Sequence, residues 1–186
     1  MKILAILGSR NHDGQTARAT RALTDAAEGS GCDVECIFLT ELELERCRQC
    51  DENGWGLCRS EGRCVIEDDF PSVVDTIESA DAVVLGNPVY FSDLSESLKS
   101  FLDRLRRITR HENGKAKVSS TPAVGVCVAG GGGGGAPNCC VLMERTLATC
   151  GFDVIDMVPC RRQNLEMKLE VLGVVGRWLA TSPSSS

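Results

Sequence analysis

The chain has 186 residues, of which 42% are hydrophobic and 25% are charged, and its net charge is -6. This composition predicts one globular domain with its own core, and the acidic balance argues against nucleic acid and anionic membranes as partners. No apolar run reaches the roughly 18 residues that a membrane span needs, and Met1 leads into an apolar run without a leader pattern. We therefore expect a cytoplasmic protein.

Apolar runs alternate with helical patterns along the whole chain. Strands are predicted over residues 2–7, 33–39, 82–86, 123–129 and 152–158. Helices are predicted over about 14–29 and over about 137–150. A short helix is predicted from near Pro71, another after a cap at Ser92 or Asp93, and a last one ending near Leu179. This order indicates an α/β fold, a doubly wound five-stranded parallel sheet in the flavodoxin-like order 2-1-3-4-5 with helices on both faces. We expect one domain over residues 1–181, with a cysteine-rich insertion at 40–68 and a disordered tail at 182–186.

The loop after the first strand runs from Gly8 to Thr16, just before a predicted helix. Glycines and small polar residues at a helix N-terminus favour an anion, so we interpret the loop as a phosphate cradle. Five residues separate Gly8 from Gly14, and Gln15 stands where a nucleoside triphosphatase loop needs lysine. This spacing argues against a triphosphate site, while an ordinary capped turn remains the alternative.

Two more unusual loops follow the third and fourth strands, Pro88-Val89-Tyr90-Phe91 and the glycine run Gly130–Gly135. In the predicted order all three loops meet at the carboxyl edge of the sheet. A stiff aromatic segment facing glycines without Cβ atoms suits a flat ring such as an isoalloxazine. The alternatives are core or interface aromatic residues and a flexible glycine hinge.

Four of the 11 cysteines lie in the insertion, as Cys47-x-x-Cys50 followed by Cys58 and Cys64. This set fits a four-iron four-sulfur cluster, a zinc ion, or thiols without metal. The third cysteine lies further from the second than in the compact pattern C-x-x-C-x-x-C-x-C. The other cysteines considered are expected to be small buried side chains, namely Cys32, Cys36, Cys127, Cys139, Cys140 and Cys150.

Arginines recur on the helix that precedes the fourth strand. Arg104, Arg106, Arg107 and Arg110 are close in sequence, and we expect them to form a solvated helix face with its own ion pairs. Recruitment of an anionic ligand is the alternative for this stripe.

Two further segments complete this set of motifs, Leu98-Lys99-Ser100-Phe101-Leu102-Asp103-Arg104 and Cys64-Val65-Ile66-Glu67-Asp68-Asp69. Together the motifs resemble the NADPH-dependent FMN reductases of the flavodoxin-like superfamily, especially the iron–sulfur flavoprotein branch. The resemblance covers nearly the whole chain. It implies that bound FMN takes hydride from NAD(P)H and passes electrons to a flavin, quinone, nitro or metal compound, without a catalytic acid or base. The implied phosphate ligands are Ser9, Arg10, Asn11, Gln15 and Thr16, and the implied ring contacts are Pro88, Val89, Tyr90, Phe91, Ala129, Gly130, Gly131, Gly132 and Gly133.

The resemblance also implies a homodimer or homotetramer, with Tyr90, Phe91 and Trp55 as candidate interface residues. Two other functions stay open at this point. One is an electron carrier, in which cluster and flavin exchange electrons with a protein partner. The other is a cysteine-based redox sensor that binds FMN without catalysis.

Overall fold

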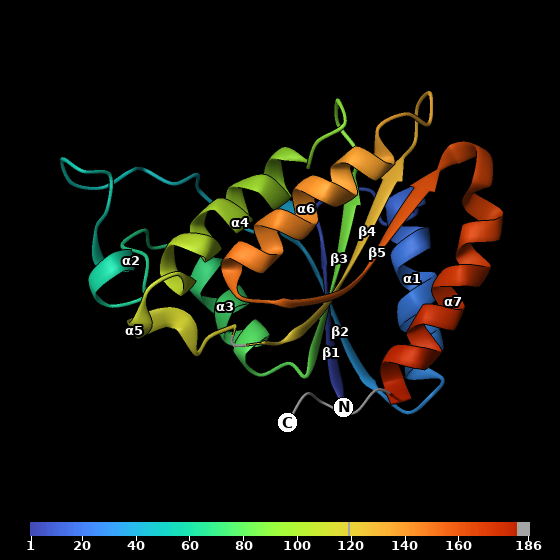
Figure 1. The fold of residues 1–186 in the computed structure, drawn as a ribbon, viewed down its shortest axis with the longest axis horizontal. Helices are drawn as coiled ribbons and strands as arrows, with labels where there is room; N and C mark the ends of the chain where they lie inside the picture. The colour runs from blue at the N-terminus through green and yellow to red at the C-terminus, as the bar shows by residue number, and fades with distance from the viewer. Residues whose placement is uncertain (119, 182–186) are drawn as a thin grey trace.

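The computed structural model describes residues 1–118 and 120–181, so the predicted tail at 182–186 lies outside the described residues. Its centre is a parallel sheet in the order β2-β1-β3-β4-β5, which confirms the predicted topology (Figure 1). The strands are β1 (Lys2–Leu7), β2 (Asp33–Phe38), β3 (Ala82–Pro88), β4 (Pro122–Ala129) and β5 (Asp153–Arg161).

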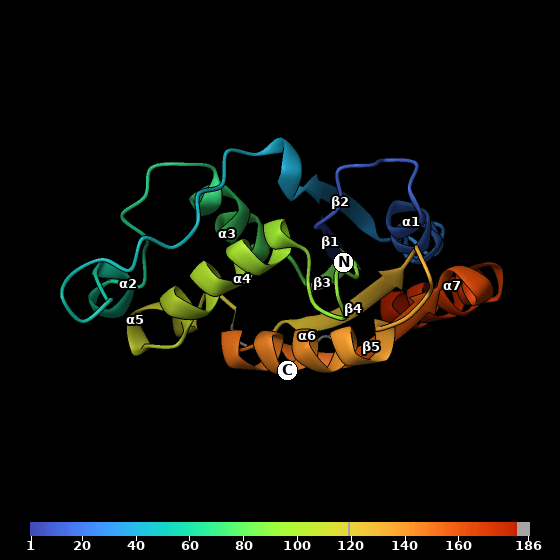
Figure 2. The same cartoon turned by 90° about the horizontal axis from the view of Figure 1, so that it is seen from above.

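Helices cover both faces of this sheet, as Figure 2 shows from above. On one face α1 (Gln15–Glu28) packs against α7 (Leu165–Thr181). The other face carries α3 (Phe70–Glu78), α4 (Glu96–Thr109) and α6 (Ala136–Cys150). The remaining helical segments are short: η1 (Leu39–Glu41), α2 (Leu57–Ser60), α5 (Glu112–Lys115) and η2 (Arg162–Asn164).

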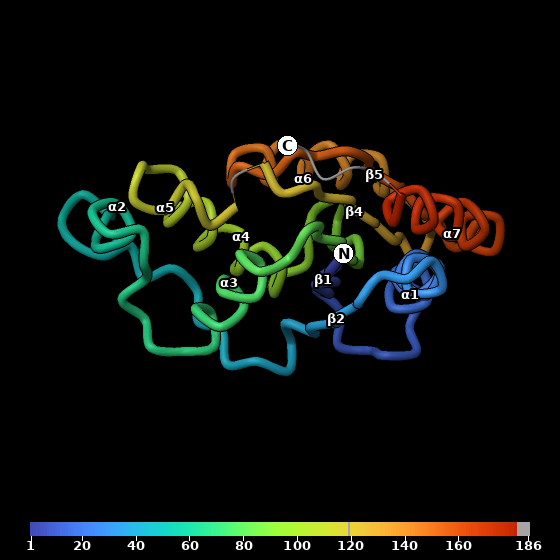
Figure 3. Tube along the Cα trace, turned by 90° about the horizontal axis from the view of Figure 1, so that it is seen from below, coloured from blue at the N-terminus to red at the C-terminus, as the bar shows by residue number. Residues whose placement is uncertain are grey.

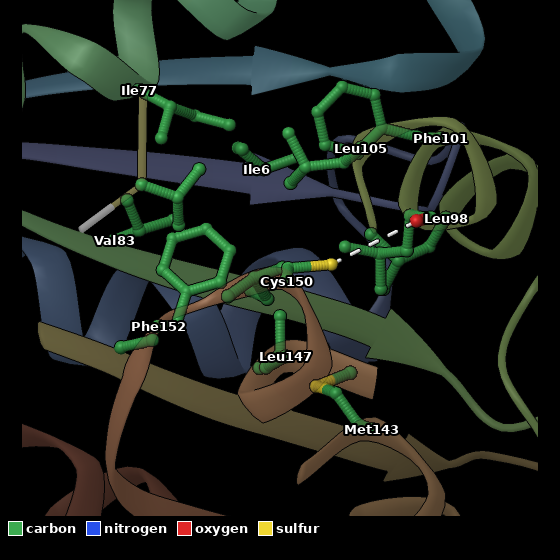
Figure 4. Packing of buried hydrophobic residues seen from close by; sticks show 14 of the residues in the cluster. Ile6, Ile77, Val83, Leu98, Phe101, Leu105, Met143, Leu147, Cys150 and Phe152 are labelled. Atoms are coloured by element: carbon green, nitrogen blue, oxygen red, sulfur yellow. Dashed lines mark hydrogen bonds between the residues drawn. The ribbon is translucent and has the colours of Figure 1, made fainter. Parts of the chain in front are cut away.

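The two faces give two hydrophobic cores, because alternate side chains of a strand point to opposite sides. Leu4 and Ile6 of β1 contribute to the core under α3, α4 and α6, whereas Ile3 and Ala5 contribute to the core under α1 and α7. In the first core Cys150 of α6 packs among aliphatic and aromatic side chains, and its thiol donates to the Leu102 carbonyl (Figure 4). Burial on both faces explains why β1 and β3 are continuous apolar runs.

The start of α4 differs from the prediction. Ser95, rather than Ser92 or Asp93, caps the helix, and its hydroxyl accepts from the Leu98 amide. Tyr90 and Asp93 instead pair across a tight turn whose central residues, Phe91 and Ser92, have φ of 50° and 68°. Ser92 and Asp93, which the local sequence offers as helix caps, therefore belong to this turn.

The cysteine-rich insertion leaves the sheet after η1 and returns at α3. Its short helix α2 lies at one end of the molecule, beside α4 and α5 (Figures 1 and 3). The loops after β3 and β4 lie at the opposite end of α4 (Figure 1). Within the part of the chain that the structure describes, no helix is both long and apolar enough to cross a membrane.

Candidate functional site

Residues of three loops line one pocket at the carboxyl edge of the sheet. Its volume is about 360 Å³, and it lies between the start of α1 and the loops after β3 and β4. Most of its lining comes from the residues implied as FMN contacts. The lining residues are Gln15, Thr16, Pro88, Val89, Tyr90, Val128, Gly130 and Gly131.

The first loop is held by its own side chains. The Ser9 hydroxyl accepts from the Asn11 amide at 3.4 Å, and the Asn11 side chain accepts from the Asp13 amide at 3.0 Å. Helix α1 then begins at Gln15 with no side-chain cap and no acidic residue in its first turn. The first amides of α1 and the positive end of its dipole are therefore available to an anion.

Gln15 carries an unusual polar atom. Its Oε1 is buried and has no hydrogen-bond partner among the described residues. The neighbouring Thr16 is 5% exposed and also lines the pocket. A buried acceptor without a donor costs free energy, so this oxygen marks a place where a ligand hydrogen bond would be favourable.

The loop after β3 depends on Asn87, which is fully buried. Its amide nitrogen donates to the Pro88 carbonyl at 2.9 Å and to the Cys139 sulfur at 3.3 Å, while its oxygen accepts from the Ser95 amide at 2.9 Å. Because Asn87 joins β3, α4 and α6, it fixes the direction in which the loop leaves the sheet.

The aromatic turn that follows is exposed. Tyr90 is 55% exposed and lines the pocket, whereas Phe91 at the tip is fully exposed. Asn138 of α6 donates to the Ser92 carbonyl at 3.1 Å and anchors the turn. The structure thus brings Tyr90 to the pocket and leaves Phe91 outside its lining.

The glycine run has one fixed end and one open surface. Gln163, just after β5, donates to the Gly132 carbonyl at 3.0 Å, and a Cβ on Gly133 would overlap the Gln163 side chain. Gly133 also has φ of 77°, a conformation that favours glycine. Cβ atoms on Gly131 or Gly132 would meet nothing within 4 Å, so the backbone there is open to a flat ligand.

A second pocket of about 510 Å³ adjoins the first, and Tyr90 lines both. Arg10 lines this second pocket together with Arg46 and hydroxyl groups at the start of α4. Arg10, like Ser9 and Asn11, is therefore outside the lining of the first pocket. His12, in the first loop, pairs with Glu41 and stacks on Phe38 at 3.8 Å between ring centroids.

All four cysteines of the insertion line a third pocket, away from the three loops. Arg104 and Arg107 of α4 complete its charged lining together with Arg48, which pairs with Glu45. Over residues 1–118 and 120–181, no three metal-ligating side chains converge closely enough to hold a single metal ion. The 11 cysteines are all free thiols.

The prediction of a solvated arginine stripe is wrong for Arg104, whose side chain is 2% exposed. Its guanidinium forms a two-point ion pair with Asp68 at 2.5 and 2.9 Å and lies 4.1 Å from the Phe70 ring centroid. The sequence pattern could not reveal this pair, because Asp68 belongs to the insertion.

Among the other cysteines, Cys36 is exposed on the edge strand β2, contrary to the prediction.

A buried group of thiols lies behind the loop after β3. Hydrogen bonds with Cys139 and Cys140, together with burial, raise the pKa of Cys127 far above its usual value. These three side chains stay inside the first core as predicted.

Sequence reasoning missed the polar residues that position the loops, Asn87, Asn138 and Gln163, although Asn87 and Gln163 could have been found as polar residues at the carboxyl ends of β3 and β5.

Comparison with known proteins places these features in a family. Residues 1–158 match the family model of the NADPH-dependent FMN reductases. An iron-sulfur flavoprotein of Methanocaldococcus jannaschii is 34% identical over 125 residues, which are 67% of this chain and 62% of that protein. One from Methanosarcina thermophila is 29% identical over 67% of this chain and 63% of its own length. The chain thus spans less than two thirds of these curated relatives.

Solved structures share the fold at low sequence identity. An NAD(P)H:quinone oxidoreductase from Methanothermobacter marburgensis superposes with a TM-score of 0.70 and 20% identity, covering 100% of this chain and 99% of that one. The match to the family model covers most of the chain, from β1 through β4 and into β5. The chain therefore belongs to the NADPH-dependent FMN reductase family.

Proposed function

We propose that the chain is an FMN-dependent NAD(P)H oxidoreductase, and the three-loop pocket is the observation that carries this proposal. Its lining combines the start of α1, the stiff Pro88-Val89 segment, and Gly130 and Gly131, of which Gly131 has open space above it. The buried Gln15 Oε1 lacks a partner among the described residues, and a polar cofactor would satisfy it. The residues present therefore fit FMN.

In this proposal the chain holds the FMN phosphate at the N-terminus of α1, with Ser9, Asn11, Gln15 and Thr16. Arg10 adds positive charge from the adjoining pocket. The ring would lie between residues 88–91 and residues 129–133, which include the start of the glycine run. When bound, FMN takes hydride from NAD(P)H and delivers electrons to a small acceptor such as a flavin, quinone, nitro or metal compound.

The protein's own contribution is position. Asn87 and Asn138 hold the loop after β3, and Gln163 holds the glycine run, so the two walls keep their separation. Tyr90 stands between the two pockets and is half exposed. We propose that NAD(P)H approaches on this open side. Rigid walls would support hydride transfer because the donor and acceptor atoms of the hydride must be held close together.

Equilibrium FMN titration of Thr16→Val tests the site. A hydrogen bond to a charged group contributes about 1.5–3 kcal/mol, so affinity should fall about tenfold or more. Thr24→Val is the matched control, because Thr24 lies on the same helix, is 7% exposed and does not line the pocket. Equal FMN affinity in Thr16→Val and the parent would contradict the phosphate assignment. Absence of NADPH oxidation by FMN-loaded protein with a quinone acceptor would contradict the reductase function.

We further propose that Cys47, Cys50, Cys58 and Cys64 hold a four-iron four-sulfur cluster. The four thiols share one pocket, and the buried Arg104 in its lining keeps an Nε–H without an acceptor of good geometry among the described residues. Such a donor fits a sulfur-rich anionic group. A cluster at this position would supply one-electron transfer to a partner protein. Iron and sulfide analysis of anaerobically purified protein tests the assignment.

Assembly into a homodimer or homotetramer is also part of the proposal. Phe91 lies in a strained turn and its whole side chain is exposed. A contact with a second copy of the chain would account for this exposure. Trp55, by contrast, is packed within the chain against Arg107 and His111. Eleven cysteines with no disulfide among them favour a reducing compartment such as the cytoplasm. Light scattering on purified protein measures the assembly directly.

A further inference from the structure

Two arginines of α4 line the four-cysteine pocket, and each is held in a defined place. Arg104 is fixed by its ion pair with Asp68 and by a hydrogen bond to the Glu45 carbonyl at 2.9 Å. Arg107 donates to the Gly54 carbonyl, and its guanidinium lies 4.2 Å from the Trp55 ring centroid. Both charges are therefore held against the wall that the cysteines share.

Arg104 retains its charge in this position. A guanidinium is always protonated in proteins, and that of Arg104 is paired with the Asp68 carboxylate. The Cys64 sulfur lies beside the guanidinium, whose Nε has no hydrogen-bond partner among the described residues. One donor of a buried cation therefore remains available to a sulfur ligand.

The charge around the pocket does not balance. Arg48 pairs with Glu45 and Arg104 pairs with Asp68, whereas Arg107 forms no ion pair among the described residues. No carboxylate lines the pocket. An excess positive charge beside four thiols favours an anionic occupant, because opposite charges within a few ångströms attract each other.

We infer that Arg104 and Arg107 are the counter-charges of the group held by the four cysteines and that they set its reduction potential. The inference rests on the proposed iron–sulfur cluster. A cluster with four thiolate ligands is negative and gains one further negative charge when it accepts an electron from a low-potential reductant. Nearby positive charge and hydrogen bonds to sulfur stabilise the reduced form more than the oxidised form, which raises the potential. Arg104 and Arg107 are positioning residues, because the cysteines would bind the cluster.

Arg107→Gln and Arg104→Lys test the two contributions separately. Arg107→Gln removes an unpaired charge, and Arg104→Lys keeps a charge for Asp68 but removes the Nε donor. Arg106→Gln is the matched control, since Arg106 lies on the same helix, pairs with Asp103 at 3.2 Å and does not line the pocket. The measurement is an anaerobic redox titration with dithionite, followed by absorbance and electron paramagnetic resonance. Iron content and circular dichroism are measured on each protein.

At a fixed potential we expect the ratio of reduced to oxidised cluster in Arg107→Gln to fall about tenfold, which is about 59 mV for one electron. Arg104→Lys should shift in the same direction, and Arg106→Gln should stay within about twofold of the parent. Loss of iron from folded Arg107→Gln but not from Arg106→Gln would also support the inference. Should Arg104→Lys fail to fold, Arg107→Gln decides by itself.

Two outcomes would overturn the inference, and they are distinguishable. If the parent binds iron but Arg107→Gln titrates like the parent, the arginines do not set the potential and the cluster proposal stands. If the parent holds no iron after anaerobic reconstitution, the inference and the cluster proposal both fail. In that case FMN titration still tests the three-loop pocket independently.

Discussion

Asp68 joins the cysteine-rich insertion to the body of the domain, and Asp68→Asn tests this role. Its carboxylate accepts from Arg104 at 2.5 and 2.9 Å and from the amides of Glu45 and Phe70 at 2.8 and 3.2 Å. The side chains of Arg104 and Asp68 are 2% and 4% exposed. The amide keeps the shape of the side chain but leaves a guanidinium buried without its counter-charge.

Removing one partner of a buried ion pair costs about 3–5 kcal/mol. For a chain of this size each kcal/mol lowers Tm by about 2–4 °C, so we expect a decrease of roughly 6–20 °C in thermal unfolding at pH 7. Asp103→Asn is the control, because Asp103 is 31% exposed and pairs with Lys99 and Arg106 at 2.7 and 3.2 Å. Exposed pairs contribute only about 0–1 kcal/mol.

The same pair predicts a pH dependence. Burial acts to raise the pKa of Asp68, but hydrogen bonds from Arg104 and two backbone amides outweigh it and hold the pKa below its ordinary value. A carboxyl with a lowered folded pKa stabilises the fold above its unfolded pKa, and this contribution is lost as pH falls through the folded pKa. The difference in unfolding free energy between parent and Asp68→Asn should therefore be constant above about pH 5 and shrink below about pH 4. A loss at pH 7 no larger than that of Asp103→Asn would refute the reasoning.

Three further predictions concern single residues. Gly133→Ala should destabilise the fold by about 1–2 kcal/mol in urea, because φ is 77° and the new Cβ meets Gln163, whereas Gly131→Ala should leave unfolding unchanged. Equal midpoints for the two variants would argue against this. In protein kept monomeric, Phe91→Gly should raise Tm, since it relieves a left-handed conformation at a position that is exposed in the single chain, and a lower Tm would contradict that account. Burial raises the pKa of Cys150 to about 12, so iodoacetamide at pH 8 should leave Cys150 unlabelled in the folded protein. The exposed Cys36 should react under the same conditions, and peptide mass mapping would show the difference.

Much of the fold could be predicted because its signals are local. The apolar runs of β1 and β3 and the helical spacing in α1 depend on short stretches, and α1 runs over Gln15–Glu28 where 14–29 was expected. The strand order followed from the right-handed crossover rule and the flavodoxin-like pattern. Boundaries were less accurate at strand ends: β5 continues to Arg161, beyond the expected 158, because it pairs with β4 as far as Ala129.

One expectation was wrong because residues distant in sequence interact, and another was wrong because of a local turn. Arg104 was expected in solvent but pairs with Asp68, and Ser95 caps α4 because the preceding residues turn back on themselves.

The sequence by itself determined the sheet, its order and the glycine-rich and aromatic loops at its carboxyl edge, because hydrophobic periodicity and turn chemistry act over a few residues. Only the tertiary structure decided which polar groups are buried together. Asn87 meets Cys139, and Asp68 meets Arg104, across long chain separations. Such contacts follow from the packing of whole elements, since burial forces each polar group to find a partner wherever the fold provides one.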